Sequence, residues 1–130
     1  MAEIYHYGPF VVERGKVNEL KRALMLNDLI QENAVPSTFF TVIDYTNERG
    51  FYKMLQHFGI TGKVLHGEQS YEIYETVHIG DQIQGRVQLL DVVSKKNNSF
   101  YYIETEYVNQ REELVARARA TLVQIAGDVL

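Results

Sequence analysis

Two stretches in the first half of the chain carry apolar residues at helical spacing. In residues 13–26 the apolar stripe lies opposite a charged face and consists of Val17, Leu20, Ala23 and Leu24. In residues 48–58 a second stripe consists of Phe51, Met54, Leu55 and Phe58, and Gly59 follows as a C-terminal stop. Both stretches are predicted to form helices. Between them, residues 27–37 predict a loop, and the β-branched and aromatic residues 38–43 predict a strand.

After Gly62 the apolar and polar residues alternate, which predicts strands. The first of these strands has His66 and Glu68 on its polar face, and its apolar face consists of Leu65, Tyr71, Ile73 and Val77. Turns at residues 80–81 and 95–98 separate two further alternating strands. A last strand is predicted from about residue 112 to residue 125, and its small apolar face consists of Leu114, Ala116, Ala118 and Ala120.

The predicted order is helix, short strand, central helix and four long strands joined by hairpin-length turns. Strands that are segregated from helices indicate an α+β domain with an antiparallel sheet. The apolar stripe of residues 48–58 suits the central helix around which such a sheet wraps in the hot-dog fold. No linker rich in Pro, Gly or Ser interrupts the chain, so residues 1–130 are expected to form one domain.

Composition narrows the classes of function. A formal net charge of -4 argues against nonspecific nucleic-acid binding, which needs Lys and Arg to neutralise phosphates. No apolar run approaches the roughly 20 residues that span a bilayer, and the N-terminus lacks a signal-peptide pattern, so a cytoplasmic location is expected. There is no cysteine, and the histidines lack metal-ligand spacing, so neither a metal nor another cofactor is expected.

Several short motifs resemble one known family. The most specific is Leu-His-Gly-Glu-Gln at residues 65–69, which is followed by Tyr71 and then by Gly80-Asp81. Residues 10–14 and 36–39 agree with that family in the same order along the chain. The chain therefore resembles the N-terminal MaoC-like dehydratase domain, which includes accessory subunits of mycobacterial (3R)-hydroxyacyl-ACP dehydratases. The resemblance implies a hot-dog fold, pairing of two such domains, and an acyl-CoA or acyl-carrier-protein thioester as ligand.

The chain departs from this family at the catalytic motif. Active members use an Asp and a His in a pattern close to Gly-Asp-x-Asn-Pro-x-His, and the matching region here is residues 27–33. Asp28 stands at the position of the aspartate, but Asn33 stands at the position of the histidine. An amide cannot exchange protons near neutral pH, so it cannot act as the acid or base. The resemblance then implies a MaoC-like partner subunit that supplies both groups.

Other residues are candidates for a site, each with two interpretations. Asp28 is either a remnant of the catalytic loop or a solvated acid. His66 is either a proton carrier, beside Glu68, or a residue that fixes a subunit contact. Gly67 in mid-strand predicts a bulge or a close backbone approach. Phe39 and Phe40 are expected to line the acyl pocket together with His66 and Gly67.

Arg117 and Arg119 alternate with alanines on the last predicted strand. In one interpretation they form cross-strand charge pairs, with Arg117 opposite Glu104. In the other, they form a basic patch that binds the phosphates of coenzyme A or an acidic carrier protein.

The sequence leaves three hypotheses about function. The first is a non-catalytic or substrate-binding subunit of an (R)-specific hydratase/dehydratase that interconverts 3-hydroxyacyl and enoyl thioesters. The second is a self-sufficient thioesterase or dehydratase that uses His66 with Glu68 or Asp28. The third is a non-enzymatic module that binds acyl thioesters. Because an exposed sheet edge needs covering, at least a dimer is expected, formed with the partner or with a second copy.

Overall fold

The computed structural model describes residues 4–26, 35–36, 38–46 and 50–125. The elements follow in the order β1 (Ile4–Val11), α1 (Arg14–Ala23), α2 (Phe39–Thr46), α3 (Phe51–His57), β2 (Val64–Ile73), β3 (Gln82–Lys95), β4 (Asn98–Val108) and β5 (Leu114–Gln124). The strands form one sheet in the order β1-β3-β4-β5-β2, and all four pairings are antiparallel. The predicted α+β architecture is therefore correct.

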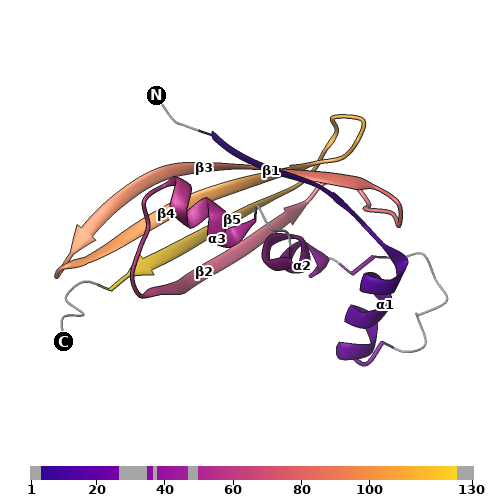
Figure 1. Ribbon diagram of the computed structural model, residues 1–130, viewed down its shortest axis with the longest axis horizontal. Coiled ribbons are helices and arrows are strands. Elements are labelled where there is room, and N and C mark those ends of the chain that lie inside the picture. The colour runs from indigo at the N-terminus through magenta and orange to yellow at the C-terminus, as the bar shows by residue number, and fades with distance from the viewer. Residues whose placement is uncertain (1–3, 27–34, 37, 47–49, 126–130) are drawn as a thin grey trace.

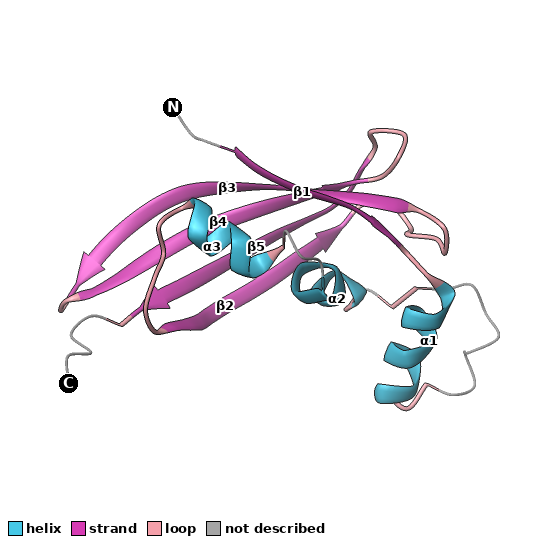
Figure 2. Ribbon diagram, viewed as in Figure 1, coloured by secondary structure: helices cyan, strands magenta, loops and turns pink. Residues whose placement is uncertain are grey.

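Helices α2 and α3 pack against one face of the curved sheet (Figures 1 and 2). We call this the inner face. The core lies between them, with Phe39, Phe40 and Ile43 of α2 buried against inward side chains of the strands. Ala116 and Ala118 are buried on β5, where their small side chains leave room for the helices, as the alternation on that strand predicts. In the described part of the chain, no helix is long and apolar enough to span a membrane.

The strand predicted over residues 38–43 is wrong, because these residues belong to α2. Their β-branched and aromatic composition favours a strand only weakly, and burial in a tertiary core overrides such propensities. The spacing of the buried Phe39, Phe40 and Ile43 fits one face of a helix.

The helix predicted over residues 48–58 exists as α3. It is not the only helix packed against the sheet, because α2 also fills the central position. Met54 is the one fully buried residue of α3 among those described, whereas Phe51, Leu55 and Phe58 are partly buried. The more deeply buried helix is α2. β1, which pairs with β3 at the opposite edge of the sheet from β2, was not predicted.

A bulge in β2 decides which side chains face the helices. The register with β5 shifts between His66 and Glu68, so the bulge predicted at Gly67 is confirmed. The extra residue reverses the alternation, so that His66 and Tyr71 both point inward although the sequence pattern put them on opposite faces. Glu68 points to the other face.

The hairpin at residues 95–98 is confirmed, because Lys96 and Asn97 have the positive φ angles, 51° and 69°, of a tight two-residue turn. The last strand is also confirmed, but the predicted register of Arg117 is wrong by two residues. Arg117 lies opposite Glu106, and Arg119 lies opposite Glu104. The hairpin before β5 closes where the backbone N–H of Asn109 bonds to the carbonyl of Glu113, so residues 110–112 form a longer loop than the predicted register requires.

Candidate functional site

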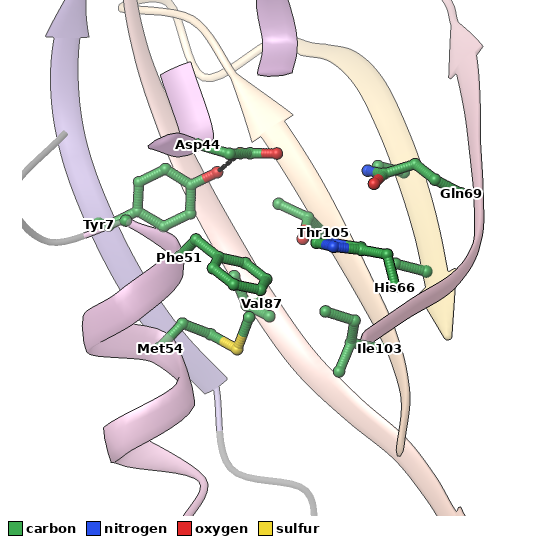
Figure 3. Close-up of a pocket in the computed structure, with 12 residues that line it drawn as sticks. Tyr7, Asp44, Phe51, Met54, His66, Gln69, Val87, Ile103 and Thr105 are labelled. Carbon is green, nitrogen blue, oxygen red and sulfur yellow. Dashed lines mark hydrogen bonds between the residues drawn. The ribbon is translucent and has the colours of Figure 1, made fainter. Parts of the chain in front are cut away.

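A small cavity lies between α3, β2 and the inner face of the sheet (Figure 3). Its polar lining comes from four elements, with Tyr7 on β1, Asp44 on α2, His66 and Gln69 on β2, and Thr105 on β4. The rest of its lining is largely apolar, with Phe51 and Met54 of α3 facing side chains of the sheet. The volume is about 30 Å³. A void of this size has room for one or two water molecules.

Two tyrosine hydroxyls hold the Asp44 carboxyl group at this cavity. The Tyr107 hydroxyl lies 2.8 Å from both carboxyl oxygens, and the Tyr7 hydroxyl donates to Oδ1. The Tyr7 ring reaches this position because β3 has Gly85 beneath it. A Cβ atom at position 85 would lie 2.2 Å from ring carbons of Tyr7. We call Asp44, Tyr7 and Tyr107 the Asp44 cluster.

Burial changes the acid-base chemistry of this cluster. Loss of solvation raises the pKa of Asp44 from 3.8 to about 6, although the two tyrosine hydrogen bonds oppose this change. Burial also raises the pKa of Tyr7 and of Tyr107 well above 10.0, and the neighbouring Asp44 adds to both. Near pH 6 the carboxyl group is therefore partly protonated, while both phenols keep their protons.

His66 lies on the opposite wall of the same cavity. Its ring stacks on Phe51 with centroids 5.1 Å apart and planes inclined by 25°. Partial burial lowers the pKa of His66 from 6.5, so the imidazole is neutral at physiological pH. Next to it, the Gln69 amide donates to the Tyr71 hydroxyl at 3.0 Å, and that hydroxyl lies 3.2 Å from Thr41 Oγ1 on α2.

The cavity thus brings together a carboxyl group whose pKa is raised and an imidazole whose pKa is lowered. Shifts of this kind are frequent at functional sites, although structural networks also produce them. With a water molecule between them, the two groups could relay a proton. A thioester does not fit into a cavity of this size.

The site residues predicted from the sequence do not lie together in one pocket. Asp28 and Asn33 lie outside the described residues. Phe39 and Phe40 are buried and line a second, apolar pocket of about 180 Å³ together with Ile43, Ile73 and Val77. Gly67 forms the bulge beside His66. Glu68 does not join His66 at the cavity, because it lines a hollow on the other face of the sheet.

Arg117 and Arg119 form the cross-strand charge pairs of the first interpretation. Arg117 Nη2 lies 2.9 Å from Glu106 Oε2, and Arg119 Nε lies 2.9 Å from Glu104 Oε2. Arg117 Nε also lies 3.6 Å from Glu104 Oε1, so the predicted contact with Glu104 occurs diagonally. These pairs leave the guanidinium of Arg119 largely exposed, with 62% of its side chain accessible.

Sequence reasoning missed the Asp44 cluster. Its one signal was a single carboxylate directly after the apolar run of residues 39–43, a position where an acid is costly unless it has partners. Tyr7 and Tyr107 lie 37 and 63 residues away in sequence from Asp44, so no local pattern links the three.

His57 and His78 do not line the cavity. His57 contacts the Tyr5 ring at 5.1 Å, and His78 Nδ1 lies 3.7 Å from Asp81. Among the residues that the structure describes, no group of three or more His, Cys, Asp or Glu side chains could hold a metal ion.

Comparison with known proteins identifies the family of this chain. Residues 3–118 match the family model described as FAS1-like, dehydratase domain region. The chain belongs to this family. No protein with curated annotation matches the chain in sequence.

Solved structures agree with this family in fold. A chain of the HadBC (3R-hydroxyacyl-ACP dehydratase) complex from Mycobacterium tuberculosis is 21% identical, with a TM-score of 0.74 over 94% of this chain and 95% of that one. The MaoC-like dehydratase from Rhodospirillum rubrum is 12% identical, with a TM-score of 0.72 over 97% of this chain and 92% of that one. A chain of the ChsH1-ChsH2 complex from Mycobacterium tuberculosis is 14% identical, with a TM-score of 0.71 over 97% and 88%. The predicted hot-dog fold and the resemblance to MaoC-like dehydratases are confirmed.

Proposed function

We propose that this member of the dehydratase family is a subunit of an (R)-specific hydratase/dehydratase that acts on 3-hydroxyacyl and enoyl thioesters. In this proposal residues 1–130 form one hot-dog domain. A MaoC-like partner subunit supplies the catalytic acid and base, and this chain supplies part of the acyl pocket.

The observation that carries the proposal is the small volume of the Asp44–His66 cavity. Both carboxyl oxygens of Asp44 accept hydrogen bonds from tyrosines, and Phe51 covers the His66 ring. At about 30 Å³ the cavity holds water but excludes a thioester. The motif resemblance also puts Asn33 at the position of the family's catalytic histidine. An acid and a base that reach the substrate must then come from elsewhere.

The apolar pocket beside α2 supports a role in binding. It is about 180 Å³ in volume, and Phe39, Phe40 and Ile43 form one wall while Ile73 and Val77 form another. Glu75 and Thr76 provide polar groups in its lining. A pocket with apolar walls and few polar groups suits the acyl part of a thioester. Two of the solved neighbours are complexes, HadBC and ChsH1-ChsH2, which supports the expectation of a partner subunit.

A second candidate function is a self-sufficient dehydratase. It is favoured by the placement of Asp44 and His66 on one cavity with opposite changes in pKa. The protonated acid would donate to C2 of an enoyl thioester, and the neutral imidazole would accept a proton from the water that adds to C3. This function requires Phe51 to move, so that substrate reaches the cavity.

Hydration of crotonyl-CoA separates the two candidates. We expect the purified chain to give no enzymatic rate alone and the complex with a MaoC-like partner to give one. In the complex, His66→Ala should retain activity within about tenfold, as should the matched control His57→Ala, which changes a histidine outside the cavity. Turnover by the chain alone that His66→Ala abolishes and His57→Ala preserves would establish the second function. Binding of the thioester without turnover, with or without a partner, would instead identify a binding module.

A further inference from the structure

The sheet face that points away from α2 and α3, called the outer face here, carries a continuous apolar row. Register pairs Leu65 with Val123, Val123 with Phe100, and Phe100 with Val93, so that the row crosses four strands. The next row along the strands, which includes His66 and Leu122, points toward the helices instead. Because side chains alternate between the faces of a sheet, the apolar row lies on the outer face.

Two large exposed side chains extend this row. Leu90 is 49% exposed and Tyr102 is 37% exposed, and both line a hollow of about 340 Å³ on the outer face. The bulge in β3 between Leu89 and Asp91 turns Leu90 toward this hollow. We call the apolar row together with Leu90 and Tyr102 the outer apolar patch.

Farther along β4 and β5 the outer face is polar and carries the ion pairs Arg117–Glu106 and Arg119–Glu104. The edge strand β1 adds two exposed apolar residues to this face, Ile4 and Val11. The bare face of an antiparallel sheet is normally polar along its whole length. The apolar half of this face is therefore unusual, and contiguous exposed patches of this kind mark interaction surfaces. Aromatic side chains such as Tyr102 and Phe100 are typical of the centres of interfaces.

We propose that the outer apolar patch binds the same patch of a second copy of this chain, so that two sheets pack face to face. The charged residues at the hollow indicate that the partner is a second copy of the chain. Glu68 and Arg119 both line it, and within the described part of the chain Glu68 has no ion-pair partner. Arg119 pairs with Glu104 through Nε and keeps 62% of its side chain exposed. A two-fold contact is self-complementary, so one patch must carry both charges. Arg119 of each copy then pairs with Glu68 of the other.

This contact is independent of the proposed catalytic partner. Leu90 and Tyr102 lie on β3 and β4, which have neighbours on both sides in the sheet order β1-β3-β4-β5-β2. In Figure 1 both sheet edges, β1 and β2, flank these strands. Packing through the outer face therefore leaves the edges available for a second hot-dog subunit. The outer-face contact therefore doubles the number of chains in the assembly that forms through the sheet edges.

The first test measures the mass of the full chain in solution by sedimentation velocity. In the variant Leu90→Lys/Tyr102→Lys we expect the number of chains per particle to halve at micromolar concentration. Val92→Lys is the matched control, because Val92 is 45% exposed on β3 but pairs with Tyr101, whose side chain belongs to the inner face. An unchanged mass in the double variant, or an equal loss in the control, would overturn the proposal. So would a wild-type particle with an odd number of chains.

The second test uses charge reversal. Glu68→Arg alone places two arginines together across the contact, and Arg119→Glu alone places two glutamates together, so each variant should associate at least tenfold more weakly than wild type. When the two variants are mixed, both cross-contacts become opposite in charge. We expect a hetero-oligomer to form, and misfolding of either variant could not produce this rescue. A mixture that stays dissociated, while circular dichroism shows both variants folded, refutes the pairing. Neither test measures activity, so its outcome does not depend on the proposed function.

Discussion

Replacing Asp44 by Asn removes a titratable group from the core while keeping its shape. Asp44 is the acid of the described part of the chain whose pKa is most clearly raised, from 3.8 to about 6, and burial is the main cause. Both tyrosines can remain hydrogen-bonded to an amide, because a hydroxyl can donate to the amide oxygen or accept from its nitrogen. The substitution should therefore change the dependence of stability on pH more than it changes the structure.

Proton linkage fixes the direction in which the Asp44 contribution to stability changes with pH. The folded chain binds the Asp44 proton more tightly than the unfolded chain does, because its folded pKa is the higher one. The stabilising contribution is complete below pH 3.8 and is lost as the pH rises through about 6. A shift of roughly two pKa units corresponds to about 3 kcal/mol of unfolding free energy. Asp44 keeps some exposed surface, so this figure is an upper value.

Urea unfolding at pH 4 and at pH 7 tests this reasoning. With nine tyrosines and no tryptophan, tyrosine fluorescence reports unfolding directly. Relative to wild type, Asp44→Asn should gain about 2 to 3 kcal/mol of unfolding free energy between these two pH values, because the wild type alone loses the Asp44 contribution. Asp91→Asn, which changes an exposed acid on β3, is the control and should show no such gain. Parallel pH dependences for wild type and Asp44→Asn would refute the buried, protonated carboxyl group.

Two further predictions concern Gly85 and the arginines. Gly85→Ala places a Cβ atom against the Tyr7 ring, so it should lower the free energy of unfolding in urea by about 1 to 3 kcal/mol. The control is Gly15→Ala on α1, where a Cβ atom meets nothing within 4 Å, and it should be neutral or stabilising. Comparable effects of the two would contradict the close approach of Tyr7. Replacing Arg117 and Arg119 by Gln should lower the melting temperature slightly and leave the affinity for an acyl-CoA unchanged, measured by calorimetry; weaker binding at unchanged stability would restore the phosphate-binding interpretation.

The second half of the chain could be predicted from its sequence because local rules govern hairpins. Alternation places side chains on the two faces of a strand, and the turn at residues 95–98 fixes the pairing of β3 with β4. Prediction from alternation fails at Gly67, where a bulge reverses the order of inward and outward side chains. A bulge can be expected at a mid-strand glycine, but the pattern does not show which residues it turns over. Alternation alone therefore predicts His66 on the polar face, although His66 lines the cavity.

The first half was harder because tertiary contacts decide its structure. Residues 39–43 are good strand formers that become a helix once their apolar side chains have a sheet to pack against. The same packing delivers Asp44 to Tyr7 and Tyr107. Neither the helix nor its partners can be predicted from neighbouring residues, since the hydrogen bonds connect α2 with β1, 37 residues before Asp44, and with β4, 63 residues after it.

The motif that carries the family resemblance has a structural role in this chain. His66 stacks on Phe51 and so connects β2 with α3. Gln69 donates to Tyr71, whose hydroxyl lies within hydrogen-bond distance of Thr41 and so connects the same strand with α2. The Gly67 bulge is what allows residues on both sides of it to face inward. Both helices need to be held in place, because α2 forms a wall of the apolar pocket and α3 lines the cavity. This structural role of the motif agrees with the proposed function, in which the chain shapes a binding site and a partner transfers the protons.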